Sequence, residues 1–276
     1  MKPLIKWAGG KRHIASVIEE HLPANWDHGT YFEPFLGGAA IFLHLQPKKA
    51  SLSDVNARLI SFYNHVKLDN DSLIAQIGKI SKKFDSTAAK EKLSMYLELR
   101  QKFNSTTTTT IQTSAQFFAL NQLCFNGLYR ENARGSFNVP FGKKEKFPPL
   151  DLVAFEQASS VFGGAKIHVS DFETALRPAK SGDFVYLDPP YIPKDATSNF
   201  TAYSSGGFGL DAQERLAALM SELTKKGVRV MLSNSSTPLT KEIYKGFRAV
   251  KIKAPRMLSA RATGRGQISE LLVMNY

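Results

Sequence analysis

The stretch TYFEPFLGGAAIFLHL, from Thr30 to Leu45, is the part of the sequence that decides the fold. Its first six residues are rich in aromatic and β-prone side chains and predict a short strand, Leu-Gly-Gly predicts a turn, and AAIFLHL predicts a helix. The segments that follow, ASLSDVN and ARLISFYNHVK, predict a second strand and a second helix. Strands that alternate with helices in this way indicate a parallel sheet.

The chain changes character between residues 58 and 125, where apolar residues recur with helical spacing. The run STTTTT, Ser105 to Thr110, interrupts this region and predicts a loop, because consecutive β-branched residues disfavour a helix. The next segment, Phe125 to Pro149, combines Gly, Pro, Asn, Arg and Lys with aromatic residues, which is typical of a hairpin or a long loop.

After Leu150 the alternation of helices and strands returns. VAFEQASSVFG and LDAQERLAALMSELTKKG predict helices, and AKIHVSDF, DFVYLDPPY and VRVMLSN predict strands. AVKIKAP and ISELLVMNY predict a terminal strand pair. We therefore predict an α/β fold with a doubly wound, mostly parallel sheet in one domain, residues 1–57 and 147–276, and an inserted helical domain at residues 58–146.

Composition narrows the class of partner. The chain has 276 residues, 43% of them hydrophobic, and 36 Lys and Arg against 24 Asp and Glu, for a formal charge of +12. Such a charge favours a polyanion such as nucleic acid, and an anionic membrane surface could use it too. No segment approaches the roughly 20 apolar residues that span a bilayer, and MKPLIKWAGGKRH lacks the apolar core of a signal peptide. We expect a soluble, cytoplasmic protein.

The single cysteine, Cys124, excludes an internal disulfide and any zinc site with several cysteines. It lies in the apolar segment LNQLCFNGL, which favours a buried packing thiol over a nucleophile. The six histidines form no HExxH motif and no cluster with cysteine. We expect neither a metal site nor covalent cysteine chemistry.

Ligands of open parallel sheets bind beyond the carboxyl ends of the strands. Here these ends are Phe35 to Gly38, Ser53 to Asn56, Asp171, and Asp188 to Tyr191. Glycine at 37 and 38 permits close approach of a ligand to the backbone, and Asp54 follows at about the spacing of an acid that binds ribose hydroxyls. This pair suggests a nucleoside cofactor. The turn is not a complete GxGxxG, so an ordinary strand-to-helix turn remains the alternative.

The tetrapeptide Asp188-Pro189-Pro190-Tyr191 indicates the reaction. An aromatic amine is a poor nucleophile because its lone pair is delocalised into the ring, and acceptors for its two protons return density to the nitrogen. Asp188 can be one acceptor and the Pro189 carbonyl the other, while proline removes competing donors and fixes φ. Tyr191 would stack on the base. The alternative is a loop in which Asp188 only forms a turn. Such a base must leave the duplex.

These segments together resemble the Dam-type DNA adenine-N6 methyltransferases, the D12 class in which the cofactor motif precedes the insertion and DPPY comes last. KWAGGKR is similar to the family's N-terminal motif, FEPFLGGAAIFL to its S-adenosylmethionine loop, and LSDVNARLISFYNHVK to its acidic second strand. NGLYRENARGSFNVPFGK is similar to its DNA-reading hairpin, and VYLDPPYIPKDATSNFTAYSSGGF and VMLSNSS resemble its catalytic region. The resemblance runs nearly from end to end.

The resemblance implies a cofactor site for S-adenosylmethionine. Trp7, Lys11, Asp54 and Asp188 match residues that bind it in the family, with Asp54 on the ribose. Phe35 would lie against the methionine portion, next to the turn at Gly37. Without the resemblance, Trp7 would be interpreted as a core residue and Lys11 as a solvated charge.

The resemblance also implies residues that read DNA. Arg130 matches the family's guanine-reading arginine, which suits bidentate donation to the two major-groove acceptors of guanine. The alternative for Arg130 is a phosphate contact. Phe125 stands where some members carry a tyrosine that fills the gap left by the flipped base. The implied DNA-binding residues are Lys6, Phe125, Asn126, Leu128, Arg130, Asn132 and Pro140, with Lys6 on a second guanine and Leu128 and Pro140 on a thymine methyl.

Some positions depart from the family pattern. The turn is FLGGAA where the family more often has FxGxGS, and Lys144 stands where some members have an aromatic contact. The STTTTT run has no counterpart in the family. PRMLSARATGRGQ, with Arg256, Arg261 and Arg265, is interpreted as a flexible phosphate-binding loop.

The activity that the resemblance implies is direct transfer of the S-adenosylmethionine methyl to N6 of a flipped adenine in duplex DNA, in GATC, by a monomer. Neither a covalent intermediate nor a metal is expected. One alternative is a methyltransferase for N4-cytosine or an RNA base, and the former more often has Ser where Asp188 stands. The other is a DNA-binding protein without catalysis, which would show a broken DPPY or lack Asp54.

Overall fold

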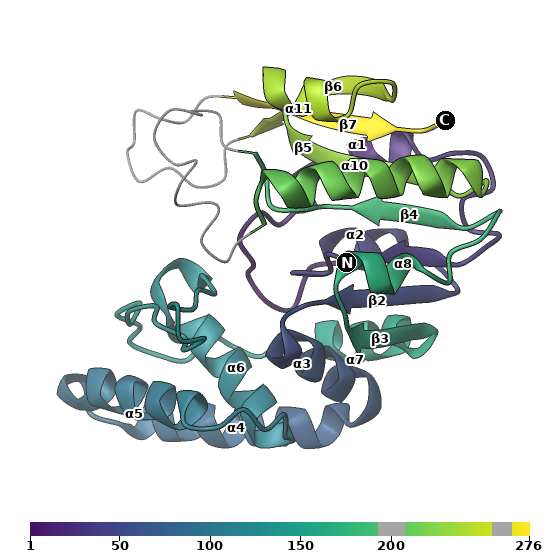
Figure 1. Ribbon diagram of the computed structural model, residues 1–276. Helices are drawn as coiled ribbons and strands as arrows, with labels where there is room; N and C mark the ends of the chain where they lie inside the picture. The colour runs from purple at the N-terminus through teal and green to yellow at the C-terminus, as the bar shows by residue number, and fades with distance from the viewer. Residues whose placement is uncertain (193–207, 256–266) are drawn as a thin grey trace. The chain divides into compact units, whose positions relative to one another are not determined.

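The computed structural model describes residues 1–192, 208–255 and 267–276, without side-chain detail at 253–255 and 267–268 (Figure 1). The predicted phosphate-binding arginines Arg256, Arg261 and Arg265 lie outside the described residues. Contacts divide the chain into two compact units. Unit 1 comprises Met1–Gly10, Gly37–Gln46 and Asp54–Val169, and unit 2 comprises Lys11–Leu36, Pro47–Ser53 and Ser170–Tyr276.

The strands of unit 2 lie in the order β2-β1-β4-β5-β7-β6. From β2 to β5 neighbouring strands are parallel, and β7 is antiparallel to both β5 and β6. The central strands β4 and β5 are almost wholly buried, as expected for parallel strands covered on both faces. Their bounds are β1 Tyr31–Glu33, β2 Ala50–Asp54, β4 Phe184–Leu187, β5 Arg229–Ser235, β6 Arg248–Pro255 and β7 Gln267–Met274.

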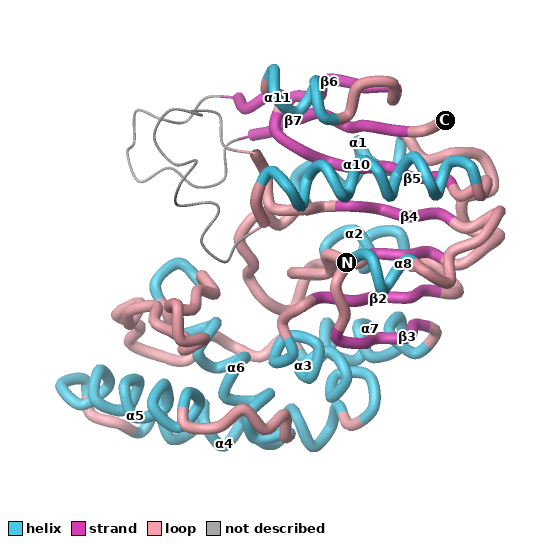
Figure 2. Tube along the Cα trace, viewed as in Figure 1, coloured by secondary structure: helices cyan, strands magenta, loops and turns pink. Residues whose placement is uncertain are grey.

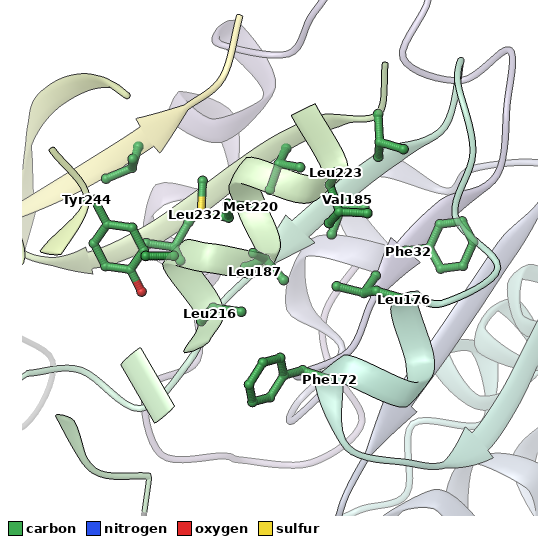
Figure 3. Packing of buried hydrophobic residues seen from close by; sticks show 14 of the residues in the cluster. Phe32, Phe172, Leu176, Val185, Leu187, Leu216, Met220, Leu223, Leu232 and Tyr244 are labelled. Atoms are coloured by element: carbon green, nitrogen blue, oxygen red, sulfur yellow. The ribbon is translucent and has the colours of Figure 1, made fainter. Parts of the chain in front are cut away.

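One face of this sheet packs against α8 (Phe172–Leu176) and α10 (Leu210–Lys225). Helix α10 places Leu216, Met220 and Leu223 at helical spacing on its buried side, where they meet side chains of β4 and β5 (Figure 3). The short helix α11 (Pro238–Ile243) follows β5, and the Thr237 side chain caps its N-terminus.

Alternate residues of the same strands face the other way. Tyr31 and Phe184 meet the indole of Trp26 edge-on there. The 3₁₀ turn Arg12–Ile14 and helix α1 (Ala15–Glu20) also belong to unit 2, and bury Ile14 and Ile18.

Unit 1 is mostly helical (Figure 2). Phe62 of α3 lies at the centre of its aromatic core and stacks on Phe118 of α6. The predicted Thr-rich loop joins α5 to α6, and its last residue, Thr110, forms a capping box with Thr113. The elements are α2 Ala40–Leu45, α3 Ala57–Leu68, α4 Asn70–Ser86, α5 Lys92–Asn104, α6 Ile111–Leu123, α7 Leu152–Gly163, β3 Ala165–Val169 and the 3₁₀ turns Ala89–Glu91 and Phe125–Gly127.

The predicted α/β class with a mostly parallel sheet is confirmed. The strand predicted from AKIHVSDF is shorter than expected, because Asp171 caps a new helix with its side chain and Phe172 begins α8. Helices α1, α8 and α11 were not predicted. The compact units do not have the same bounds as the predicted domains. The predicted domains separate the residues by function, and that functional division stays a prediction.

Candidate active site

Asp188 directly follows Leu187, the last residue of strand β4. The Asp188 Oδ1 atom lies 2.8 Å from Lys11 Nζ and accepts a hydrogen bond of 2.7 Å from Ser233 Oγ. Ser233 is in place because Leu187 pairs with Leu232 on the neighbouring strand β5. The hydroxyl of Tyr186 lies 3.0 Å from Ser233 Oγ. Because the Ser233 hydroxyl donates its one proton to Asp188, the Tyr186 hydroxyl is the donor in this pair.

This setting acts on the charge of Asp188 in two directions. Burial raises the pKa of the Asp188 carboxyl, and the Lys11 ammonium and the Ser233 hydroxyl oppose part of that rise. Both contacts are to Oδ1, which leaves acceptor positions on Oδ2 within the described part of the chain. Lys11 is itself only 5% exposed, so the interpretation of Lys11 as a solvated charge is wrong.

The backbone that follows Asp188 is held by side chains of two other elements. Gln213 of α10 donates to the Pro190 carbonyl at 2.8 Å. Asn234 accepts from the Ile192 amide at 3.1 Å, and Ser235 donates to the Ile192 carbonyl at 2.6 Å. Buried polar groups satisfied in this way give a loop of fixed shape.

Tyr191 completes this group. Its hydroxyl donates to Glu270 Oε2 of β7 at 2.7 Å, and the Lys11 ammonium lies 4.4 Å from the centroid of its ring. Burial raises the pKa of Tyr191 well above its usual range, so the hydroxyl keeps its proton. Lys11, Asp188 and Tyr191, predicted separately from two motifs, are thus brought together within unit 2.

Phe35, which follows β1 in unit 2, is half-buried. Its ring stacks on Phe172 with centroids 5.7 Å apart and meets Phe208 edge-on at 5.4 Å. An apolar wall is therefore present at the position predicted to contact the methionine portion of the cofactor.

The glycine turn belongs to unit 1. Gly37 has φ +45°, and a Cβ atom there would lie 2.8 Å from Cδ1 of Trp7, so the indole takes the space that a side chain would need. The Gly37 amide donates to Asp54 Oδ2 at 3.0 Å, and Tyr63 donates to the Gly37 carbonyl at 2.9 Å. Trp7, Gly37 and Asp54 are therefore brought together, as their shared prediction requires.

Asp54 can accept more hydrogen bonds than it does here. Its Oδ1 accepts from the Asn56 amide at 3.0 Å and its Oδ2 from Gly37. Burial raises the pKa of Asp54, and these backbone donors oppose the rise. An ionised carboxylate offers about four acceptor positions, and the backbone of Asn56, Gly37 and Val55 already acts on it, so acceptor capacity remains for a ribose. The residues present fit a nucleoside cofactor.

The segment from Phe125 to Phe141 folds back on itself as predicted, but through isolated bridges, Cys124 with Phe141 and Glu131 with Phe137, and not as a regular hairpin. The thiol of Cys124 is buried, as predicted, and its pKa rises to about 11 by burial. Asn104 anchors the segment, because its side chain makes both hydrogen bonds to the backbone of Phe137, each 2.9 Å.

The predicted DNA-reading residues lie along this segment. Arg130 is exposed, and its Nε donates to Asn138 Oδ1 at 2.8 Å, while Asn132 forms the turn at the tip. Phe125 is 52% exposed, which is unusual for a phenylalanine that has only a packing role. The Phe125 amide donates to the Pro140 carbonyl at 2.9 Å, so these two predicted residues are neighbours.

Lys6 joins this group from the start of the chain. Asn121 of α6 accepts from the Lys6 amide at 3.1 Å and donates to the carbonyls of Lys6 and Gly127. The aliphatic part of the Lys6 side chain covers Gly127, where a Cβ would lie only 2.5 Å from it. The ring of Trp7 also stacks on Tyr129, with centroids 5.1 Å apart, so the residue that packs on the glycine turn also contacts the segment Phe125–Phe141.

Comparison with known proteins now decides the class. Residues 7–258 match the family model of D12 class N6 adenine-specific DNA methyltransferases. The chain belongs to this family. It is an adenine-specific DNA methyltransferase, as predicted.

Relatives of this methyltransferase cover the chain along its whole length. A Type II methyltransferase M1.LlaDCHI from Lactococcus lactis subsp. cremoris is 38% identical over 281 residues, covering 100% of this chain and 96% of the relative. M.MjaIII of Methanocaldococcus jannaschii, also a Type II methyltransferase, is 38% identical, covering 100% and 99%. The DNA adenine methylase of Escherichia coli K12 is 34% identical, covering 99% and 95%. In the described part of this methyltransferase, no helix is long and apolar enough to cross a membrane.

Sequence analysis missed several residues of the methyltransferase site. Gln213, Asn234 and Ser235 hold the DPPY backbone, and Glu270 holds the Tyr191 hydroxyl. The segment VMLSNSS was identified as part of the catalytic region, but the roles within it were not assigned. Gln213 had a usable signal, because it is a polar residue on the apolar stripe of α10 and is 1% exposed.

Proposed function

We propose that this enzyme transfers the methyl group of S-adenosylmethionine to N6 of an adenine that is flipped out of duplex DNA, and that its target is 5'-GATC-3'. The observation that carries the proposal is the buried Asp188 carboxylate, fixed beside Tyr191 in one rigid loop. Relatives named DNA adenine methylase are consistent with it. The enzyme acts as a monomer.

Asp188 supports the reaction as a hydrogen-bond acceptor. Its free Oδ2 positions accept one N–H of the adenine amine, and the Pro189 carbonyl accepts the other, which restores electron density to the nitrogen. Proline at 189 and 190 offers no backbone N–H, so the amine meets no competing donor there. Tyr191 offers its ring face to the base. A flipped base costs a few kcal/mol of lost stacking, which this contact helps to offset.

The cofactor, when bound, supplies a methyl group on a cationic sulfonium, a leaving group that needs no further activation. Asp54 accepts from the ribose hydroxyls through its remaining positions, and Gly37 lets the backbone come close. Trp7, Lys11 and Phe35 are further contacts by resemblance. Phe35 supports this role as a half-buried ring in an aromatic cluster with Phe172 and Phe208.

The exposed segment around Arg130 reads the target. Arg130 has its guanidinium anchored at Nε by Asn138, which leaves the two terminal nitrogens to donate to O6 and N7 of guanine. Lys6 contacts a second guanine, and Leu128 and Pro140 contact a thymine methyl. Phe125 fills the space that the flipped adenine leaves, for which its exposed ring is suited.

The substitution Asp188→Ala tests the catalytic assignment. Transfer of a tritiated methyl group to DNA should be abolished, while binding of the duplex, measured by fluorescence anisotropy, persists. Asp151→Ala is the matched control, because Asp151 only caps α7 and its loss should leave transfer intact. Retained turnover in Asp188→Ala would show that the carboxylate does not have this role.

The target is tested on DNA methylated by the purified enzyme. Digestion with a restriction enzyme that methylation blocks should leave GATC sites uncut, and single-molecule sequencing should report modified adenine within GATC. Modified cytosine, or adenine in another context, would overturn this part of the proposal and leave the family assignment intact. Light scattering at working concentration tests the monomer.

A further inference from the structure

Glu270 lies in the candidate active site, although it belongs to none of the sequence motifs from which that site was predicted. Its carboxylate is 10% exposed and belongs to β7, about 80 residues after the catalytic tetrapeptide in the sequence. One oxygen accepts from the Tyr191 hydroxyl at 2.7 Å, and the other lies 3.6 Å from Nε2 of His13. Burying a carboxylate costs free energy unless the carboxylate is paired, so these two contacts are what allow Glu270 to be buried here.

The strand pairing fixes the backbone position of Glu270. Glu270 pairs with Ser235 on β5 and with Ile252 on β6, so its backbone is held on both sides. Ser235 also holds the carbonyl of Ile192 at 2.6 Å. The paired residues Ser235 and Glu270 therefore hold Tyr191 at two points. Ser235 holds the backbone that follows it, at Ile192, and Glu270 holds its hydroxyl.

Two anchors restrict the ring strongly. With its backbone fixed by Gln213 and Asn234 and its hydroxyl fixed by Glu270, Tyr191 can only rotate about the axis that joins the two ends. A hydrogen bond to an ionised acceptor is about twice as strong as one between neutral groups, so this anchor is not easily exchanged for water. The ring that faces a flipped base would thus be held in one place before the base arrives.

Glu270 also stays charged in this setting. Burial raises the pKa of its carboxyl, but the His13 imidazole 3.6 Å away, the hydrogen bond from Tyr191 and the Lys11 ammonium outweigh this rise, and the pKa is lowered. The titratable groups that face Glu270 are His13 and Lys11 at the start of unit 2, Tyr186 of β4, and Asp188 and Tyr191 after β4.

We propose that Glu270 is a positioning residue for base stacking, which acts through the Tyr191 hydroxyl to hold the ring in the plane that receives the flipped adenine. The inference rests on the proposed function, since it needs a base that leaves the duplex and stacks on Tyr191. Preorganised groups of this kind raise the rate because the reacting atoms meet in the right geometry.

The variants are Glu270→Ala, Glu270→Gln and Tyr191→Phe. In single-turnover transfer with saturating DNA, Glu270→Ala should lower the rate by about tenfold to a hundredfold, the scale for a slightly misplaced reactant. Its KM for DNA should change little. Glu270→Gln, whose amide oxygen still accepts from the hydroxyl, should recover most of the rate. Tyr191→Phe should be slow as well, and adding Glu270→Ala to it should cost little more, because the two act through one bond.

A spectroscopic readout separates positioning from stability. In a duplex with 2-aminopurine at the target adenine, fluorescence reports the flipped base, and Glu270→Ala should change its intensity because the base no longer stacks on a fixed ring. Asn275→Ala is the matched control. Asn275 is close by in sequence, and its side chain makes three hydrogen bonds to α10, β5 and the turn between them, so loss of that side chain should lower stability without changing fluorescence or rate.

Each outcome decides one question. If wild-type enzyme methylates the duplex with adenine at the target position but shows no fluorescence change on the matching duplex with 2-aminopurine there, base flipping in the proposed function fails. If wild type flips and methylates but Glu270→Ala matches it in rate and fluorescence, only the role of Glu270 fails. The same holds if Glu270→Gln is as slow as Glu270→Ala, because the acceptor would then not be what matters.

Discussion

Replacing Gly37 by alanine tests how the predicted cofactor turn is built. Gly37 has φ +45°, and its new Cβ would lie 2.8 Å from Cδ1 and 3.0 Å from Nε1 of Trp7. Two costs therefore arise, one from the left-handed backbone and one from overlap with the indole. Gly135→Ala separates them, because Gly135 has φ +72° in the same unit and its Cβ would meet nothing within 4 Å.

The two costs have different sizes. A residue with a Cβ loses about 1–2 kcal/mol in the left-handed region, and both variants incur this. Forcing extra volume into a packed site costs about 1–3 kcal/mol more, and only Gly37→Ala incurs that. We expect Gly37→Ala to lose about 2–5 kcal/mol of unfolding free energy and Gly135→Ala about 1–2 kcal/mol.

Urea denaturation of both variants measures these losses, and calorimetric titration measures the affinity for S-adenosylmethionine. The affinity for S-adenosylmethionine should fall in Gly37→Ala, because a displaced turn moves the Gly37 amide, which donates a hydrogen bond to Asp54. It should be unchanged in Gly135→Ala. In a Trp7→Ala background, Gly37→Ala should lose the overlap cost and approach the Gly135→Ala value. Equal losses in the two single variants, or additive effects with Trp7→Ala, would refute the reasoning.

Three further outcomes are expected. Burial raises the pKa of Asp188, and its ionised form is the stronger acceptor for the amine, so single-turnover rates should fall as pH drops through a value above the usual aspartate range. Ser233→Ala should move this fall to higher pH, and an unmoved profile would contradict the contact. Arg130→Ala should lose about 1–3 kcal/mol of discrimination at one guanine, and equal weakening on every duplex would make Arg130 a phosphate contact. Asn104→Ala should cost about 1–3 kcal/mol of stability and speed amide exchange at Phe137, because two backbone groups lose their partner; unchanged exchange would argue against the anchor.

The parts of the fold that the sequence predicted well are those in which a local pattern is strong. The glycine turn between β1 and α2 and the apolar stripe of α10 each follow from a few consecutive residues, as does the helical region from α3 to α6. Helices α1, α8 and α11 have only five or six residues, too few for a period to appear. For α8 and α11 the caps were the available signal, since Asp171 and Thr237 each accept from a backbone amide three residues later, whereas Ile14 at the start of α1 provides no side-chain cap.

The site could be predicted only as far as its motifs reached. Asp188 and Tyr191 were predicted because a tetrapeptide carries them together. Gln213, Ser233 and Glu270 were not, because they reach the loop from α10, β5 and β7, and only the strand order brings those elements beside β4. A linear pattern names the reacting groups, whereas their supports depend on pairings between distant segments.

The two halves of the proposed activity are held by separate sets of contacts. Asp188 and Tyr191 are fixed by residues of unit 2, whereas Arg130 and its anchor Asn138 lie in unit 1, where Asn104 fixes the reading segment. Side chains that share no partner contribute nearly independently to free energy. In the proposed function, a change along Phe125–Phe141 therefore alters which sequence is chosen without disturbing how Asp188 is held. This separation explains physically why DPPY alone indicates amine methylation, while the choice of adenine in a particular duplex sequence has to come from elsewhere in the chain.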